Sequence, residues 1–101
     1  MSDDSIYLDH AAATPVDAKV RAAMEPFLSD EFFNPSAPYA PAIAVRRKYI
    51  AAKQRIARCI GAKADDLVMT AGATESINLA FASVSDYVVT ASIEHHAVLQ
   101  A

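Results

Sequence analysis

Short apolar runs alternate with longer segments of helical pattern in this chain, and the alternation limits the folds open to it. Residues 66–70 (DLVMT) and 87–92 (YVVTAS) have the length and composition of buried strands. A helix is expected after each of them, over residues 74–82 and from residue 94 onward. Strands that alternate with helices predict an α/β architecture.

Two further helices are expected before the first strand. Over residues 14–28, Thr14 is a suitable N-cap and Pro15 fits the first helical position, whereas Pro26 should strain the helix near its end. Residues 42–60 repeat the helical pattern, and Gly61 is a typical helix stop. The expected apolar faces of the two helices comprise Val16, Val20, Ala23, Met24 and Phe27, and Val45, Tyr49, Ala52, Ile56 and Ile60.

Composition excludes several classes of protein. A hydrophobic fraction of 53% is sufficient for a core, so a disordered chain is not expected. The net charge of -3 and the absence of a basic arm argue against nucleic-acid or acidic-membrane binding. No apolar run approaches the roughly 20 residues that span a bilayer, and no signal peptide is recognised. The single cysteine fits a reducing, cytoplasmic location.

The segment TAGATESINLA, residues 70–80, joins the first expected strand to its helix. Gly72 is one of only two glycines, and glycine permits a tight turn and a close approach of the backbone to a ligand. Free N–H groups at Ala73 and Thr74, together with the helix dipole, would favour an anion such as phosphate. A capped corner with Thr74 as the N-cap explains the same residues without a ligand. The phosphate-loop and GxGxxG motifs are both absent.

The segment SIEHHAVL, residues 92–99, follows the second expected strand, at the end where ligands gather in α/β folds. An imidazole there could stack on a planar ligand or move protons near neutral pH. Alternatively, His95 and His96 simply begin a helix. Glu94 adds a potential metal ligand, but the i, i+4 pairing of zinc helices is missing, so no metal site is predicted.

Four segments, in this order, resemble the N-terminal part of cysteine desulfurases: IYLDHAAATPV, NPSAP, LVMTAGATESINLAF and VVTASIEHHAVL. These are pyridoxal 5'-phosphate enzymes of fold type I, in the class V aminotransferase group. The resemblance covers essentially the whole chain. It implies that Ala73 and Thr74 hold the cofactor phosphate, that His95 stacks on the pyridine ring and assists proton transfer, and that residues 9–15 line the substrate side of the pocket.

The resemblance also implies a fold. Residues 1–101 are expected to form a single incomplete domain, the N-terminal part of a fold-type I large domain, helix-rich with two or three short strands. Later sequence would supply the strands between residues 66–70 and 87–92, so both segments would expose unpaired edges here. Self-association as a homo-oligomer is expected to cover them. The chain departs from its relatives at Tyr39, where a histidine is common, and in a shortened connection over residues 81–87.

The resemblance implies a reaction in which sulfur is transferred from L-cysteine to an enzyme cysteine as a persulfide, and alanine is released. The persulfide sulfur then passes to a sulfur-acceptor protein, as in iron–sulfur cluster assembly. The cofactor acts as electron sink. By the resemblance, the Schiff-base lysine and the nucleophilic cysteine belong beyond residue 101. No lysine of this chain lies in a matching motif, and Cys59 is expected to be a small buried hydrophobe. The chain alone should therefore be inactive, with weak or absent cofactor binding. Two other functions stay open: a selenocysteine lyase, or a non-catalytic interaction or structural module.

Overall fold

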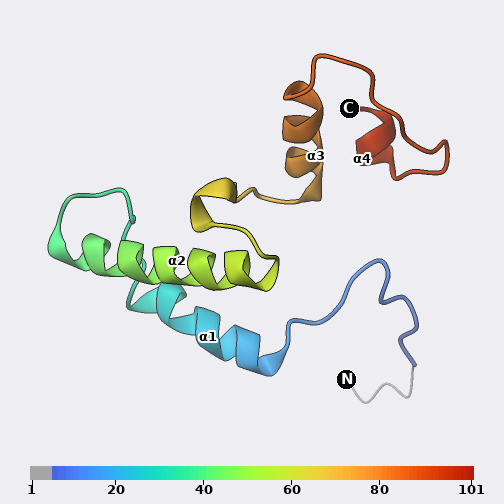
Figure 1. The fold of residues 1–101 in the computed structure, drawn as a ribbon. Coiled ribbons are helices and arrows are strands. Elements are labelled where there is room, and N and C mark those ends of the chain that lie inside the picture. Colours follow the sequence, from blue (N-terminus) through green and yellow to red (C-terminus); the bar gives the residue numbers. More distant parts are fainter. Residues whose placement is uncertain (1–5) are drawn as a thin grey trace. The chain divides into compact units, whose positions relative to one another are not determined.

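A computed structural model describes residues 6–101 of the chain. It contains four α-helices and one short 3-10 helix within these residues: α1 (Ala18–Ser29), α2 (Ala40–Cys59), η1 (Ala64–Asp66), α3 (Ala73–Ala82) and α4 (His96–Leu99) (Figure 1). The chain divides into two compact units, Met1–Ala52 and Lys53–Ala101, so that α2 begins in the first unit and ends in the second.

Helix α1 begins later than the sequence pattern predicts. Its N-cap is Asp17, whose carboxylate accepts a hydrogen bond from the Lys19 backbone N–H at 2.7 Å. Thr14 and Pro15 therefore lie before the helix, and their assignment as N-cap and first helical residue is wrong. An Asp side chain in extended backbone can satisfy one of the free N–H groups of the first turn, which fixes the start at this position.

Helix α2 ends where the glycine predicts. Gly61 adopts a φ of 69°, a left-handed conformation that favours glycine. The Ala62 N–H donates to the carbonyl of Ala57 at 2.9 Å, and the Gly61 N–H donates to the carbonyl of Arg58 at 3.3 Å. This pair of bonds is a Schellman motif, which satisfies two carbonyls at the helix end.

In the first unit, Lys48 connects α2 to the end of α1. Its ammonium forms an ion pair with Glu31 and lies 5.9 Å from the ring centroid of Phe27. The loop between the helices adds an aromatic cluster, in which Phe33 stacks on Phe32 at 4.7 Å and meets Tyr39 edge-on at 6.2 Å. Ala42 and Val45 are the buried hydrophobic residues of this unit within the described chain.

The second unit contains the end of α2, followed by η1, α3 and α4. Helices α3 and α4 contact each other within this unit (Figure 1). Ala57 is its one buried hydrophobic residue among those described. The predicted burial of Cys59 is wrong, since its side chain is exposed. Two apolar residues near it are also exposed: Ile56 of α2 at 48%, and Ile60, which follows the helix, at 66%.

The expected strands do not form in the structure. Residues 6–101 contain no strand: residues 67–70 and 87–91 lack regular structure, and Asp66 belongs to η1. A strand exists only as part of a hydrogen-bonded ladder, and neither segment has a partner within the described residues. The predicted helix-rich character of the chain is confirmed by the four α-helices of the described residues. The α/β arrangement and the single incomplete domain stay predictions. No helix of residues 6–101 combines the length and apolar character needed to cross a bilayer.

Candidate functional site

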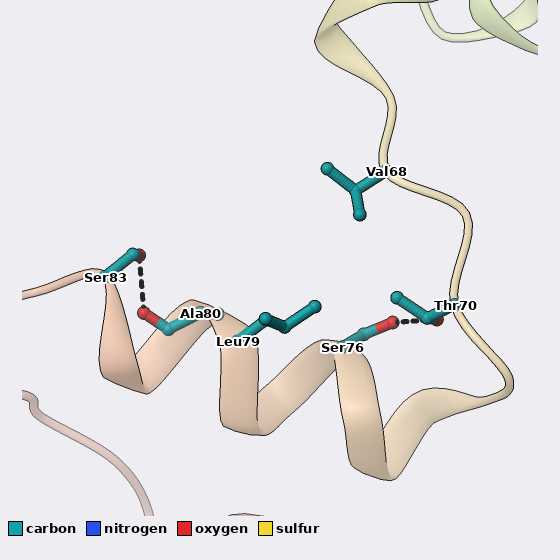
Figure 2. A pocket seen from close by; sticks show the side chains of 6 residues that line it. All are labelled: Val68, Thr70, Ser76, Leu79, Ala80 and Ser83. Carbon is teal, nitrogen blue, oxygen red and sulfur yellow. Dashed lines mark hydrogen bonds between the residues drawn. The ribbon is translucent and has the colours of Figure 1, made fainter.

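The turn before α3 is held by side chains on both sides of Gly72, its N-cap residue. Before the turn, the Ala71 N–H donates to a carboxylate oxygen of Glu75 at 2.7 Å. The hydroxyls of Thr70 and Ser76 lie 2.7 Å apart across the turn (Figure 2), and each can donate to the carbonyl of Gly72, at 3.2 and 3.3 Å. The Ser76 N–H donates to the same carbonyl at 3.2 Å. The turn is therefore anchored by at least three groups.

Beyond these anchors, the first turn of α3 keeps free donors. Within residues 6–101, the backbone N–H groups of Ala73, Thr74 and Glu75 make no hydrogen bond. Nor does the Thr74 hydroxyl within that range. Thr74 is the second residue of the helix, so its alternative assignment as the N-cap is wrong. Free N–H groups at the start of a ten-residue helix are suited to an anion.

Gly72 is not required by its backbone conformation. Its φ of 168° and ψ of 179° are extended values open to any residue, so the predicted tight turn is not the reason for glycine here. A Cβ built at Gly72 meets no atom within 4 Å. The structure thus leaves open space at the turn, beside the free N–H groups of Ala73 and Thr74, which fits the requirement of a phosphate for close backbone approach.

His95 is the N-cap of α4. Its Nδ1 accepts a hydrogen bond from the Ala97 backbone N–H at 3.1 Å. In neutral imidazole one nitrogen accepts and the other donates, so this contact places the proton of neutral His95 on Nε2. The His96 ring lies edge-on to the His95 ring at 6.4 Å. Residues 6–101 hold no cluster of three potential metal ligands.

The structure brings Ala73 and Thr74 together on α3, and places His95 at the N-cap of α4, a helix that contacts α3. It records no hydrogen bond between His95 and either of the other two within the described residues. Two apolar grooves lie along α3, and neither is lined by these three residues. The larger, of about 410 Å³, is lined by Val68, Thr70, Ser76, Leu79, Ala80 and Ser83 (Figure 2).

Residues 9–15, expected to line a substrate pocket, lie in the first unit, where residues 10–12 form a turn. The Tyr7 hydroxyl lies within hydrogen-bond distance of two carbonyl oxygens, of Asp9 at 2.8 Å and of Ala13 at 2.9 Å, and can donate to either, which closes the segment on itself. The His10 ring stands edge-on to the Tyr7 ring, with centroids 5.0 Å apart. Tyr7 therefore shapes this segment, a role that the sequence pattern did not reveal.

Sequence reasoning also missed Glu75, Thr70 and Ser76 as residues that hold the α3 turn. One signal was available for Glu75. A glutamate three residues after the N-cap can reach back to a backbone N–H before the helix. An N-cap at Thr74 would instead make Glu75 the first helical residue, without that spacing. Placing the N-cap at Gly72 makes Glu75 the third helical residue and explains its bond to Ala71.

Comparison with known proteins places the chain among relatives about four times its length. It is 40% identical to cysteine desulfurase IscS of Dictyoglomus turgidum, over 94% of this chain and 26% of the relative. It is 38% identical to putative cysteine desulfurase IscS 1 of Bacillus subtilis, over 95% of this chain and 27% of the relative. The chain thus spans about a quarter of the curated relatives it matches. No solved structure gives a significant match.

The family comparison extends over every residue that the structure describes. The model of the family "aminotransferase class-V" matches residues 6–101. This range includes the anchored turn of α3 and the histidine at the start of α4. With the identity to the cysteine desulfurases, the match shows that the chain belongs to the aminotransferase class-V family.

Proposed function

We propose that this chain is the N-terminal part of a pyridoxal-phosphate-dependent cysteine desulfurase, and that it supplies the cofactor's phosphate site. The substrate would be L-cysteine, whose sulfur passes through an enzyme persulfide to an acceptor protein while alanine is released. The observation that carries the proposal is the pair of unpaired N–H groups at Ala73 and Thr74, at the start of α3. They lie in a chain whose relatives are named cysteine desulfurases.

The described residues fit pyridoxal 5'-phosphate at its phosphate end. The N–H groups of Ala73 and Thr74 would donate to phosphate oxygens, with the Thr74 hydroxyl as a third donor, and the open space at Gly72 would let the phosphate approach. When bound, this cofactor supplies an electron sink for bonds at the substrate's α-carbon.

His95 would lie against the cofactor ring and act through its Nε2 atom. Its Nδ1 accepts from the Ala97 N–H, so neutral His95 presents a hydrogen-bond donor at Nε2 and accepts no proton there. The contact of α4 with α3 supports a shared site, since it keeps the two segments in one unit. His95 is the one residue of the chain proposed to be catalytic.

The α/β fold of the complete domain is also a proposal, and it rests on the two segments of strand composition that have no partner among the described residues. Residues 67–70 and 87–91 would become strands once further strands lie beside them, which would complete a large-domain sheet of α/β type. In the chain alone, these edges and the exposed apolar residues favour self-association as a homo-oligomer. A cytoplasmic location and a role in iron–sulfur cluster assembly complete the proposal.

Binding of pyridoxamine 5'-phosphate to the isotope-labelled chain tests the phosphate site. This ligand cannot form a Schiff base with surface lysines. We expect it to shift the NMR amide signals of Ala73 and Thr74, whereas pyridoxamine, which lacks the phosphate, should leave them unchanged. Equal effects of the two ligands, or no effect at these amides, would reject the phosphate site.

Turnover tests the rest of the proposal. The 101 residues contain no lysine in a motif that matches the family's Schiff-base lysine. With L-cysteine and pyridoxal phosphate, the purified chain should therefore release no more sulfide than a control without protein. Sulfide well above that control would contradict the proposal that these 101 residues alone cannot carry out the reaction. If no phosphate ligand binds, the desulfurase proposal gives way to the alternative of a non-catalytic interaction or structural module.

A further inference from the structure

Glu75 makes the hydrogen bond that fixes the entry to α3. Its carboxylate accepts the Ala71 N–H at 2.7 Å, one residue before the N-cap. The four consecutive residues from Ala71 to Thr74 each carry a backbone N–H group at the turn where the proposed phosphate would bind. Glu75 engages the first, while those of Ala73 and Thr74 stay free within the described residues.

The same side chain has an electrostatic effect of opposite sign. Glu75 is the one acidic residue in the first turn of α3, and it is exposed to solvent. An acidic group at a helix start is favourable to the helix itself. Toward a phosphate at the adjacent N–H groups, however, its negative charge is repulsive. Hydrogen bond and charge therefore act against each other at this site.

We propose that Glu75 is a positioning residue for the phosphate site. Its hydrogen bond holds the 70–73 turn so that the N–H groups of Ala73 and Thr74 are presented together, while its charge limits how tightly a phosphate ester binds. This inference rests on the proposed function, because it assigns a role to Glu75 in the phosphate site proposed there. Glu75 touches neither the cofactor nor the substrate in this role.

Two variants separate the two effects. Glu75→Gln keeps an acceptor oxygen of the same reach and removes the charge. Glu75→Asp keeps the charge, but its side chain is one methylene shorter and cannot make the same contact with Ala71. Asp86→Asn removes one negative charge in the connection beyond the far end of α3 and serves as the matched control.

The first measurement needs no ligand. Amide hydrogen exchange by NMR reports whether the Ala71 N–H is bonded. We expect Ala71 to exchange at a similar rate in the wild-type chain, Glu75→Gln and Asp86→Asn, and severalfold faster in Glu75→Asp. Equal Ala71 exchange in wild type and Glu75→Asp would overturn the positioning role, whatever the outcome with ligands.

The second measurement is titration with pyridoxamine 5'-phosphate, followed at the Ala73 and Thr74 amides. Glu75→Gln should bind about threefold tighter than wild type, with the gain reduced at high salt, and Glu75→Asp about threefold weaker. Asp86→Asn should match wild type. If the ligand shifts these amides but the order differs, the Glu75 inference alone is wrong. If it shifts them in no variant, the phosphate site is wrong and the inference falls with it.

Discussion

Gly61 and Gly72, the two glycines of the chain, lie in different backbone environments. Gly61 has a φ of 69°, a conformation in which an added Cβ is strained although no atom lies within 4 Å. Gly72 is extended, with equally open surroundings. Only Gly61 is therefore needed for the backbone conformation of the fold. The absence of a side chain at Gly72 is explained by the proposed ligand, which would use the open space at the turn.

Gly72→Ala should separate binding from stability. We expect its free energy of unfolding to stay unchanged or to rise by up to about 1 kcal/mol, because alanine restricts the unfolded chain and adopts the extended backbone without strain. Binding of pyridoxamine 5'-phosphate should weaken, since the methyl group enters the space at the turn. Urea unfolding and NMR titration measure the two effects.

Gly61→Ala is the matched control for that substitution. Its left-handed backbone should cost about 1–2 kcal/mol in the free energy of unfolding, without a direct effect on the α3 turn. A loss of stability in Gly72→Ala as large as in Gly61→Ala would show that Gly72 serves the fold and would remove this support for the ligand site.

The tautomer of His95 can be tested directly. In the wild-type chain, long-range ¹H–¹⁵N NMR should show neutral His95 with its proton on Nε2, because the Ala97 N–H donates to Nδ1. Ala97→Pro removes that donor and should allow both tautomers, whereas Ala97→Gly keeps the donor and should behave as wild type. A wild-type His95 protonated mainly on Nδ1 would contradict the assigned N-cap contact.

Among the elements, α1 shows how a helix start is selected. Thr14 and Asp17 are both N-capping residue types, and the motif Thr14-Pro15 is a good start signal. The structure uses Asp17, whose carboxylate reaches the Lys19 N–H. Sequence rules identify candidate caps, and the contact that forms decides among them.

Asp17→Ala should therefore destabilise the chain by about 1 kcal/mol, the usual effect of losing an N-cap side chain. The helical signal in circular dichroism should fall with it. Thr14→Ala is the control and should change the free energy of unfolding little, since Thr14 lies before the helix. If Thr14→Ala is the more damaging of the two, the helix begins where the sequence pattern alone predicted.

For the whole chain, the small core is the dominant property. The buried hydrophobic residues among those described are Ala42, Val45 and Ala57, and no large side chain is fully buried. Large apolar residues remain exposed, including Tyr87 at 101% and Val89 at 95%. Burial of apolar area is the main favourable term in folding, so this chain has little of it to hold one cooperative structure.

Urea unfolding of the dilute chain should accordingly be broad, with an m value at or below about 1 kcal/mol/M, the low end for small proteins. Because self-association is proposed to cover the apolar faces, the midpoint should rise with protein concentration. A sharp transition whose midpoint is independent of concentration would contradict both the weak core and the proposed oligomer.

The sequence alone determined the features that depend on local interactions. The presence of the four α-helices, the stop at Gly61 and the family resemblance were readable from it, though not the start of α1, because helix formation and capping involve residues a few positions apart. The start of the α3 helix was predicted only approximately, since Gly72 and not Thr74 is its N-cap.

Tertiary structure decided the features that need a distant partner. Residues 67–70 and 87–91 have strand composition but form no strand among the described residues, and the apolar faces of α1 and α2 stay largely exposed. A helix closes its hydrogen bonds within its own segment, whereas a strand and a buried face each require a second segment to complete them.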